Sequence, residues 1–187
     1  MVRAPDWETL DGALKATHRK PYDDVHGPVL HHDIRLDAGA VVQLSFKPEP
    51  KARTVFHFDK REGHLCRVVL TPDAFYLIRR DDGPDKATRL AERQTPIAAD
   101  QWHTLVIELA GDEMLATLDG RETIFGWRDD LDRPKTRILL EASSGSVWFK
   151  NFRVWEATPN KNWPTTKEAL LKARPAANET AIPGAKR

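Results

Sequence analysis

The segment RTVFHFDK, residues 53–60, places two side chains capable of acid–base chemistry two positions apart. His57 and Asp59 alternate with two phenylalanines, which is the spacing of a strand with one apolar and one polar face. An imidazole and a carboxylate on the same face can share a ligand or exchange a proton with it. We therefore take His57 and Asp59 as the candidate catalytic pair.

Polar side chains also alternate with apolar ones in the segments VVQLSFKP, HLCRVVL and AFYLIRRD. The members predicted to point away from the core are Gln43, Arg67, Tyr76 and Arg80. Amide, guanidinium and phenol groups hydrogen-bond sugar hydroxyls, and an aromatic ring packs against the C–H face of a sugar. If these strands are neighbours in one sheet, we expect a substrate-binding patch beside His57 and Asp59. The alternative is an ordinary solvated sheet face.

The tryptophans allow two interpretations. Trp127 lies in the mixed-charge segment FGWRDDLDRP, where an exposed indole would bind a ligand and a buried one would only cover the core. Trp102, Trp148 and Trp155 lie in predicted strands, and we expect them to pack in the core or between strands.

His64 either caps its strand or borders the site.

Possible metal ligands are few. His31 and Asp33 face the same way in HHDIRL, but a solvated strand edge explains them equally well. The acidic turn RRDDGPD, with Asp81, Asp82 and Asp85, offers oxygen ligands for calcium, with a solvated turn as the simpler interpretation. We therefore expect no metal and no cofactor.

The elements that position these residues are predicted to be antiparallel strands. In WHTLVIELAGDEMLATLDG, residues 102–120, Leu105 and Ile107 fall on one face, and Asp119-Gly120 provides a two-residue hairpin turn. Similar alternating segments recur about a dozen times between turn signals. This pattern predicts an all-β fold, a two-sheet antiparallel β-sandwich of the jelly-roll type.

The closing segment SVWFKNFRVWEA changes phase. Phe149 and Phe152 can both reach the core only if an extra residue lies near Lys150-Asn151, which predicts a β-bulge. A helix is predicted after it, with Thr166 as the N-cap. Residues 87–100 are expected to form the longest loop. The predicted divisions are a sandwich domain at 1–158, a helical extension at 159–174 and a disordered tail at 175–187.

Composition limits the possible classes of function. The 187 residues include 29 basic and 28 acidic side chains, a net charge of +1 without basic blocks, so a dedicated nucleic-acid-binding protein is not expected. No apolar run approaches the length of a membrane span. Cys66, the single cysteine, lies in an apolar run and is expected to be a buried, inert thiol.

Several motifs together carry a family resemblance. These are the opening W-x-x-x-DG-x-L, the segment GHLCRVVLTPDAFYL, the Trp102 hairpin and the closing SVWFKNFRVWE. Over residues 7–157 the chain resembles concanavalin A-like jelly rolls, and more narrowly it is similar to bacterial 3-keto-disaccharide hydrolase-like domains, also labelled family 16 glycoside hydrolase-like. The paired-acid motif E-x-D-x-x-E of true family 16 glucanases is absent, which disfavours their retaining chemistry.

Three functions follow from the residues and the resemblance. The first is a carbohydrate-recognition domain that binds a glycan ligand on its polar sheet face. The second is an enzyme resembling the 3-keto-glycoside hydrolases, with His57 and Asp59 as the acid–base pair acting on a keto-sugar. The third is a protein-interaction module like laminin G-like domains.

The location depends on the N-terminus. MVRAPDWETL lacks the pattern of a signal peptide, so the chain taken as it stands is cytoplasmic. If Met1 replaces a removed export signal, the protein is periplasmic or extracellular, which is what the resemblance implies.

Overall fold

The computed structural model describes residues 6–18, 27–37, 39–80, 87–158 and 160–172, with side chains as far as residue 169. These residues form thirteen strands and one α-helix. The elements are β1 (Trp7–Leu10), β2 (Ala13–Thr17), β3 (Val29–Leu36), β4 (Gly39–Pro48), β5 (Arg53–Lys60), β6 (Gly63–Leu70), β7 (Ala74–Arg80), β8 (Ala87–Gln94), β9 (His103–Ala110), β10 (Glu113–Leu118), β11 (Glu122–Trp127), β12 (Lys135–Ser144), β13 (Ser146–Ala157) and α1 (Trp163–Lys172).

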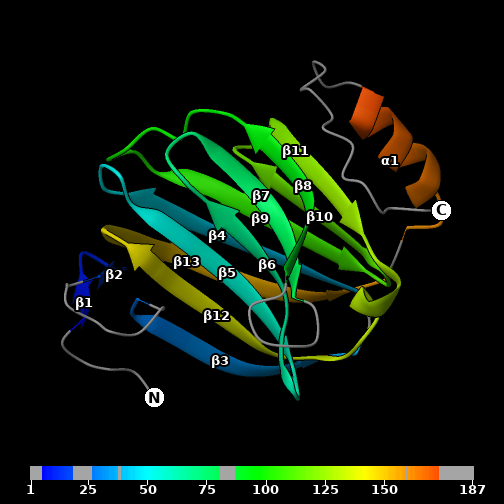
Figure 1. Ribbon diagram of the computed structural model, residues 1–187, viewed down its shortest axis with the longest axis horizontal. Coiled ribbons are helices and arrows are strands. Elements are labelled where there is room, and N and C mark those ends of the chain that lie inside the picture. Colours follow the sequence, from blue (N-terminus) through cyan, green and yellow to red (C-terminus); the bar gives the residue numbers. More distant parts are fainter. Residues whose placement is uncertain (1–5, 19–26, 38, 81–86, 159, 173–187) are drawn as a thin grey trace.

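The strands form two antiparallel sheets that lie face to face (Figure 1). One is seven-stranded, in the order β1-β2-β13-β4-β9-β10-β11, and the other is six-stranded, in the order β3-β12-β5-β6-β7-β8. Helix α1 lies at one end, where the Trp163 indole and the Lys167 ammonium both contact the carboxylate of Glu113 on β10. The predicted two-sheet antiparallel β-sandwich with a short C-terminal helix is therefore confirmed.

The core lies between the sheets and follows the alternation of the strands. Leu105 and Ile107 on β9 have no exposed surface. Phe56 and Phe58 on β5, in the other sheet, belong to the same buried apolar cluster. The thiol of Cys66 is also buried there, and desolvation raises its pKa to about 12, so it is protonated and inert as expected.

The predicted bulge in the closing strand is present. The register between β13 and β4 shifts between Lys150 and Arg153, and Asn151 has a φ of 54°. Phe149 is 2% exposed, as predicted, whereas Phe152 is only partly buried against the core. The bulge thus returns the strand to the core side without burying its second half completely.

The hairpin between β10 and β11 turns at Asp119 and Gly120, whose φ angles are 51° and 66°. Both φ angles are positive, as the sequence predicts, and the Arg121 amide donates to the Leu118 carbonyl at 3.0 Å. The register pairs Leu118 with Glu122, however, so three residues rather than the predicted two separate the strands. The Asp119 carboxylate also accepts hydrogen bonds from the His103 ring at 2.7 Å and from the Thr104 amide at 2.7 Å. The turn is therefore tied to the start of β9.

Replacing Gly120 with valine should destabilise the protein by about 1–3 kcal/mol, because a β-branched residue is strained at positive φ. Chemical denaturation measures the effect. Arg121→Val is the matched control, since Arg121 is exposed and is not among the residues with positive φ. Equal stability of the two variants would show that backbone strain at Gly120 is negligible.

Two local predictions are wrong. Residues 87–94, expected to be part of a loop, form β8, because pairing with β7 imposes an extended backbone on a sequence of weak strand propensity. Helix α1 begins at Trp163, and the Thr166 amide already donates to the Asn162 carbonyl at 2.9 Å, so Thr166 is not the N-cap. Pro164 fits the first turn, where no intrahelical amide bond is lost. The expected tail from residue 175 lies outside the described residues.

Within the described part of the chain, no helix has the length and apolar character needed to cross a bilayer.

Candidate functional site

The outward surface of the six-stranded sheet is defined by cross-strand pairs, whose side chains lie on the same face. His57 on β5 pairs with Arg67 on β6 and with Leu139 on β12. Val69 on β6 pairs with Tyr76 on β7. We call this surface the polar face. Its functional groups are His57, Asp59, Arg67, Tyr76, Arg80 and Glu141.

The centre of the polar face is a buried hydrogen-bonded contact between β5 and β12. His57 Nε2 lies 2.7 Å from Glu141 Oε2, and the two side chains are 2% and 3% exposed. Because a carboxylate only accepts, Nε2 donates, and Nδ1 of the neutral ring carries a lone pair. Burial lowers the pKa of His57, opposed by the hydrogen bond and the charge of Glu141. His57 is therefore a neutral imidazole that Glu141 orients.

A second imidazole–carboxylate pair lies beside the first. His64 Nδ1 is 2.7 Å from Asp59 Oδ1, and the His57 and His64 ring centroids are 5.0 Å apart. The β5–β6 register shifts between Phe58 and Asp59, which places Asp59 opposite His64. The sequence suggested that His57 and Asp59 would act together, but each is bonded to a different partner.

An apolar strip continues from these pairs across β6 and β7. Val55, Val69 and Tyr76 form a buried cluster separate from the main core, with Ile78 packed against it. The Arg89 guanidinium lies 4.2 Å from the centroid of the Tyr76 ring and covers it. The polar face therefore combines guanidinium and imidazole groups with apolar surface.

The structure brings together five of the seven residues predicted for the site: His57, Asp59, Arg67, Tyr76 and Arg80. Gln43 does not join them, because β4 belongs to the seven-stranded sheet, where Gln43 pairs with Val106. Trp127 is half-buried at the end of β11, also in that sheet. The sequence interpretation missed Glu141, although a glutamate in the apolar segment TRILLEA was a visible signal.

The polar face points away from the core, as alternation predicts, but its floor is not solvated. His57 is 1% exposed and Asp59 is 5% exposed. The assumption that both side chains face solvent is therefore wrong. Substituting them should change stability as well as any binding, because buried hydrogen-bonded groups are lost.

The expectation that three strand tryptophans pack inside is wrong for two of them. Trp102 and Trp155 are 39% and 43% exposed. Trp102 and the half-buried Trp148 lie on the outside of the seven-stranded sheet, where Lys47 lies 5.4 Å and 4.9 Å from their ring centroids. These rings are partly covered by lysine side chains rather than by the core.

The described residues contain no group of three or more side chains suited to hold a metal ion. Asp33 lies 2.9 Å from Arg137, so its carboxylate is already occupied by an ion pair. The acidic turn at 81–85 lies outside the described residues.

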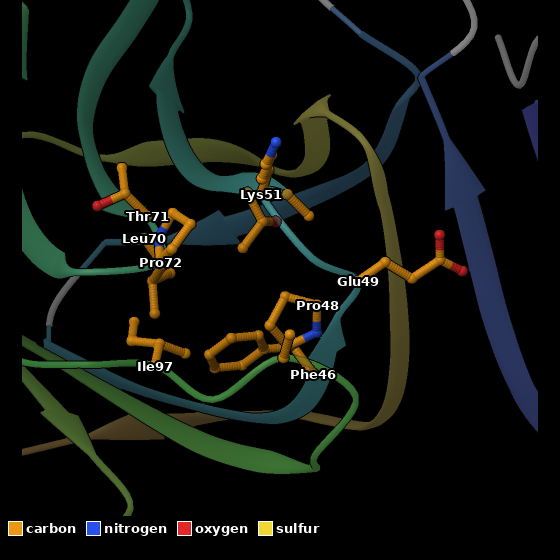
Figure 2. A pocket seen from close by; sticks show the side chains of 11 residues that line it. Phe46, Pro48, Glu49, Lys51, Leu70, Thr71, Pro72 and Ile97 are labelled. Atoms are coloured by element: carbon orange, nitrogen blue, oxygen red, sulfur yellow. The ribbon is translucent and has the colours of Figure 1, made fainter.

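A small cavity opens at one end of the sandwich, away from the polar face. Figure 2 shows Phe46, Pro48 and Ile97 on one side of it and Leu70 and Pro72 on the other, with the Glu49 carboxylate pointing away. Its volume of about 20 Å³ is enough for a water molecule but not for a sugar ring. This cavity is therefore not a saccharide site.

No protein-family model and no curated protein matches the chain. Several solved structures do. A carbohydrate-binding module from Bacillus subtilis has a TM-score of 0.64 at 15% identity, over 81% of this chain and 91% of the module. A family 7 alginate lyase has a TM-score of 0.60 at 12% identity, over 84% and 85%. A Caenorhabditis elegans galectin has a TM-score of 0.56 at 12% identity, over 80% and 99%. The chain thus has the concanavalin A-like β-sandwich fold.

Proposed function

We propose that the protein recognises a glycan with its polar face. The observation that carries this proposal is a pair of buried polar atoms, His57 Nδ1 and Arg67 Nε, for which no described residue supplies a hydrogen-bond partner. Buried polar groups in folded proteins are nearly always paired. Both atoms lie beneath the surface, so a ligand reaches them by displacing the half-buried Arg67 side chain; a sugar hydroxyl then donates to the His57 lone pair and a sugar oxygen accepts from Arg67. One polyhydroxylated ligand therefore satisfies both atoms.

The apolar strip supports the same ligand class. Ile78, which is only partly buried beside the polar groups, offers apolar surface for the C–H face of a sugar ring, with the buried Tyr76 ring supporting it from below Arg89. A carbohydrate-binding module and a galectin share the fold, which is consistent with this use of it. An exported location, expected from the family resemblance, belongs to the same proposal.

A second candidate is a 3-keto-glycoside hydrolase-like enzyme, and the His57–Glu141 pair is the observation that favours it. A neutral imidazole held by a carboxylate through Nε2 has its other nitrogen free to act as a base. In this proposal Nδ1 takes the C2 proton acidified by the 3-keto group. The C–H electron pair forms the C1–C2 double bond and expels the glycosidic oxygen, which leaves as the protonated alcohol, and water then adds to C1. Glu141, rather than Asp59, is the positioning residue.

Calorimetric titration with a panel of soluble oligosaccharides, including a 3-keto-disaccharide, tests the proposal. At least one member should bind the wild type, and Arg67→Ala should weaken that binding about tenfold or more, because a charged hydrogen bond contributes roughly 1.5–3 kcal/mol. The matched control is Gln43→Ala on the other sheet, which should bind normally.

Product release is measured in the same samples. Binding without turnover supports the recognition domain, whereas turnover of the 3-keto-disaccharide replaces it with the enzyme. Absence of any binding, or loss of binding in Gln43→Ala but not in Arg67→Ala, would contradict the assignment to the polar face.

A further inference from the structure

The carboxylates of the polar face are already paired within the protein. Each lies within hydrogen-bonding distance of a basic side chain on the same or a neighbouring strand. The pairs are Glu141 with His57, Asp59 with His64, Asp33 with Arg137, and Glu92 with Arg89. Asp33 and Glu92 are balanced by their arginine partners. Glu141 keeps its charge because its partner His57 is neutral, and this one charge offsets only part of the positive charge around Arg67.

Three guanidinium groups of the same face have no ion pair with any carboxylate among the described residues. These are Arg67, Arg80 and Arg53, the last of which lies four residues before His57 on β5 and therefore on the same side of that strand. The Nε atoms of Arg53 and Arg67 are buried and have no hydrogen-bond partner in the described part of the chain. Guanidinium groups do not lose their proton in proteins, so the positive charge stays.

Arg67 lies within the electrostatic influence of the other two cations. Burial lowers the pKa of Arg67, and the neighbouring charges of Arg80 and Arg53 lower it further, with Glu141 opposing them. A half-buried cation next to two others is in an unfavourable environment unless an anion neutralises it. No described carboxylate forms an ion pair with Arg67, so the neutralising anion is left for a ligand to supply.

The surroundings of Arg67 limit what that ligand is. Arg67 lies between His57 and Ile78 in one cross-strand row, so an anion bound to it touches a hydrogen-bond acceptor on one side and apolar surface on the other. A free inorganic anion uses only the guanidinium groups. A sugar ring that carries an acidic group can bind the guanidinium groups, donate a hydroxyl hydrogen bond to His57 and pack against the apolar surface at Ile78.

We propose that the ligand of the polar face is an acidic saccharide, whose carboxylate or sulfate group binds Arg67, with Arg53 and Arg80 flanking that position from the two ends of the strands. This inference rests on the proposed function, because it assigns a charge to the ligand of the same site. Guanidinium groups bind planar oxyanions through two parallel hydrogen bonds, which gives both affinity and orientation.

The test compares an oligogalacturonate with its methyl ester, which has the same rings and hydroxyls but no charge. The acid should bind about tenfold more tightly or better, and this preference should shrink between roughly 50 and 200 mM salt. Arg67→Gln should remove the preference, so that acid and ester bind with similar affinity. A sulfated oligosaccharide and its desulfated form are a second matched pair, which distinguishes sulfate from carboxylate.

Arg153→Gln is the control variant, because it removes the same charge from an exposed position on the other sheet. It should keep the full preference for the acid. Equal binding of acid and ester together with equal binding of the sulfated and desulfated forms would overturn the acidic ligand. The glycan site itself is tested separately, by the effect of Arg67→Ala on binding of the uncharged forms. An equal loss in Arg153→Gln and Arg67→Gln would assign the effect to net charge and overturn the role of Arg67.

Discussion

Replacing Glu141 with alanine is expected to lower the free energy of unfolding by about 1–3 kcal/mol and to weaken glycan binding roughly tenfold or more. The variant leaves the Nε2–H group of His57 buried without its acceptor, since the two side chains are 2.7 Å apart and almost fully buried. It also frees the ring to rotate, so Nδ1 is no longer aimed at the ligand. Urea denaturation and calorimetric titration measure the two effects.

Glu141→Gln separates the hydrogen bond from the charge. The amide oxygen can still accept from His57, so most of the stability should return. The unfolded chain protonates histidine near pH 6.5, whereas burial keeps the folded pKa of His57 lower. The stability from neutral His57 is thus complete above pH 6.5 and is lost as the pH falls toward the folded pKa. Removing the Glu141 charge lowers the folded pKa of His57 further, so in Glu141→Gln the loss of stability should extend to more acidic pH.

Unchanged stability in Glu141→Ala would mean that the pair contributes nothing to the fold.

Replacing Ile107 with alanine should destabilise the protein by about 2–5 kcal/mol. Ile107 has no exposed surface and lies in the main core between the sheets, so the change removes buried apolar contacts and leaves a cavity. The matched control is Val106→Ala on the opposite face of the same strand, where the side chain is half-buried and the loss should be much smaller. Similar losses in the two variants would contradict the assignment of faces on β9.

Alternation predicted the polar face well where successive strands are joined by hairpins. β5, β6 and β7 follow one another in the chain and pair in the same order, so His57, Arg67 and Tyr76 had to share a side once the apolar residues faced inward. The primed turn at Asp119-Gly120 was predictable for a similar reason, because few residues tolerate positive φ.

Residues were misplaced where the chain passes from one sheet to the other. β4 and β5 are consecutive, yet the turn at 49–52 carries the chain across the core, and Gln43 consequently lies on the far sheet. Nothing in that turn distinguishes a crossing from a hairpin. Glu141 was missed because it comes from β12, which inserts beside β5 from a distant part of the sequence. Burial of the polar face was also unpredictable, because alternation tells which side a residue faces and not how deeply it lies.

The long-range pairing of β13 has a consequence for how the protein is made. The first half of β13 lies between β2 and β4, with Val147 opposite both Ala16 and Pro48. Contacts between such distant positions slow folding, since a long loop must close before they form. During synthesis, the edges of β2 and β4 that pair with β13 therefore stay unpaired until residues 146–157 leave the ribosome. Exposed strand edges promote aggregation. Completion of the seven-stranded sheet is thus a late event, and the facing edges of β2 and β4 are open to aggregation until β13 is in place.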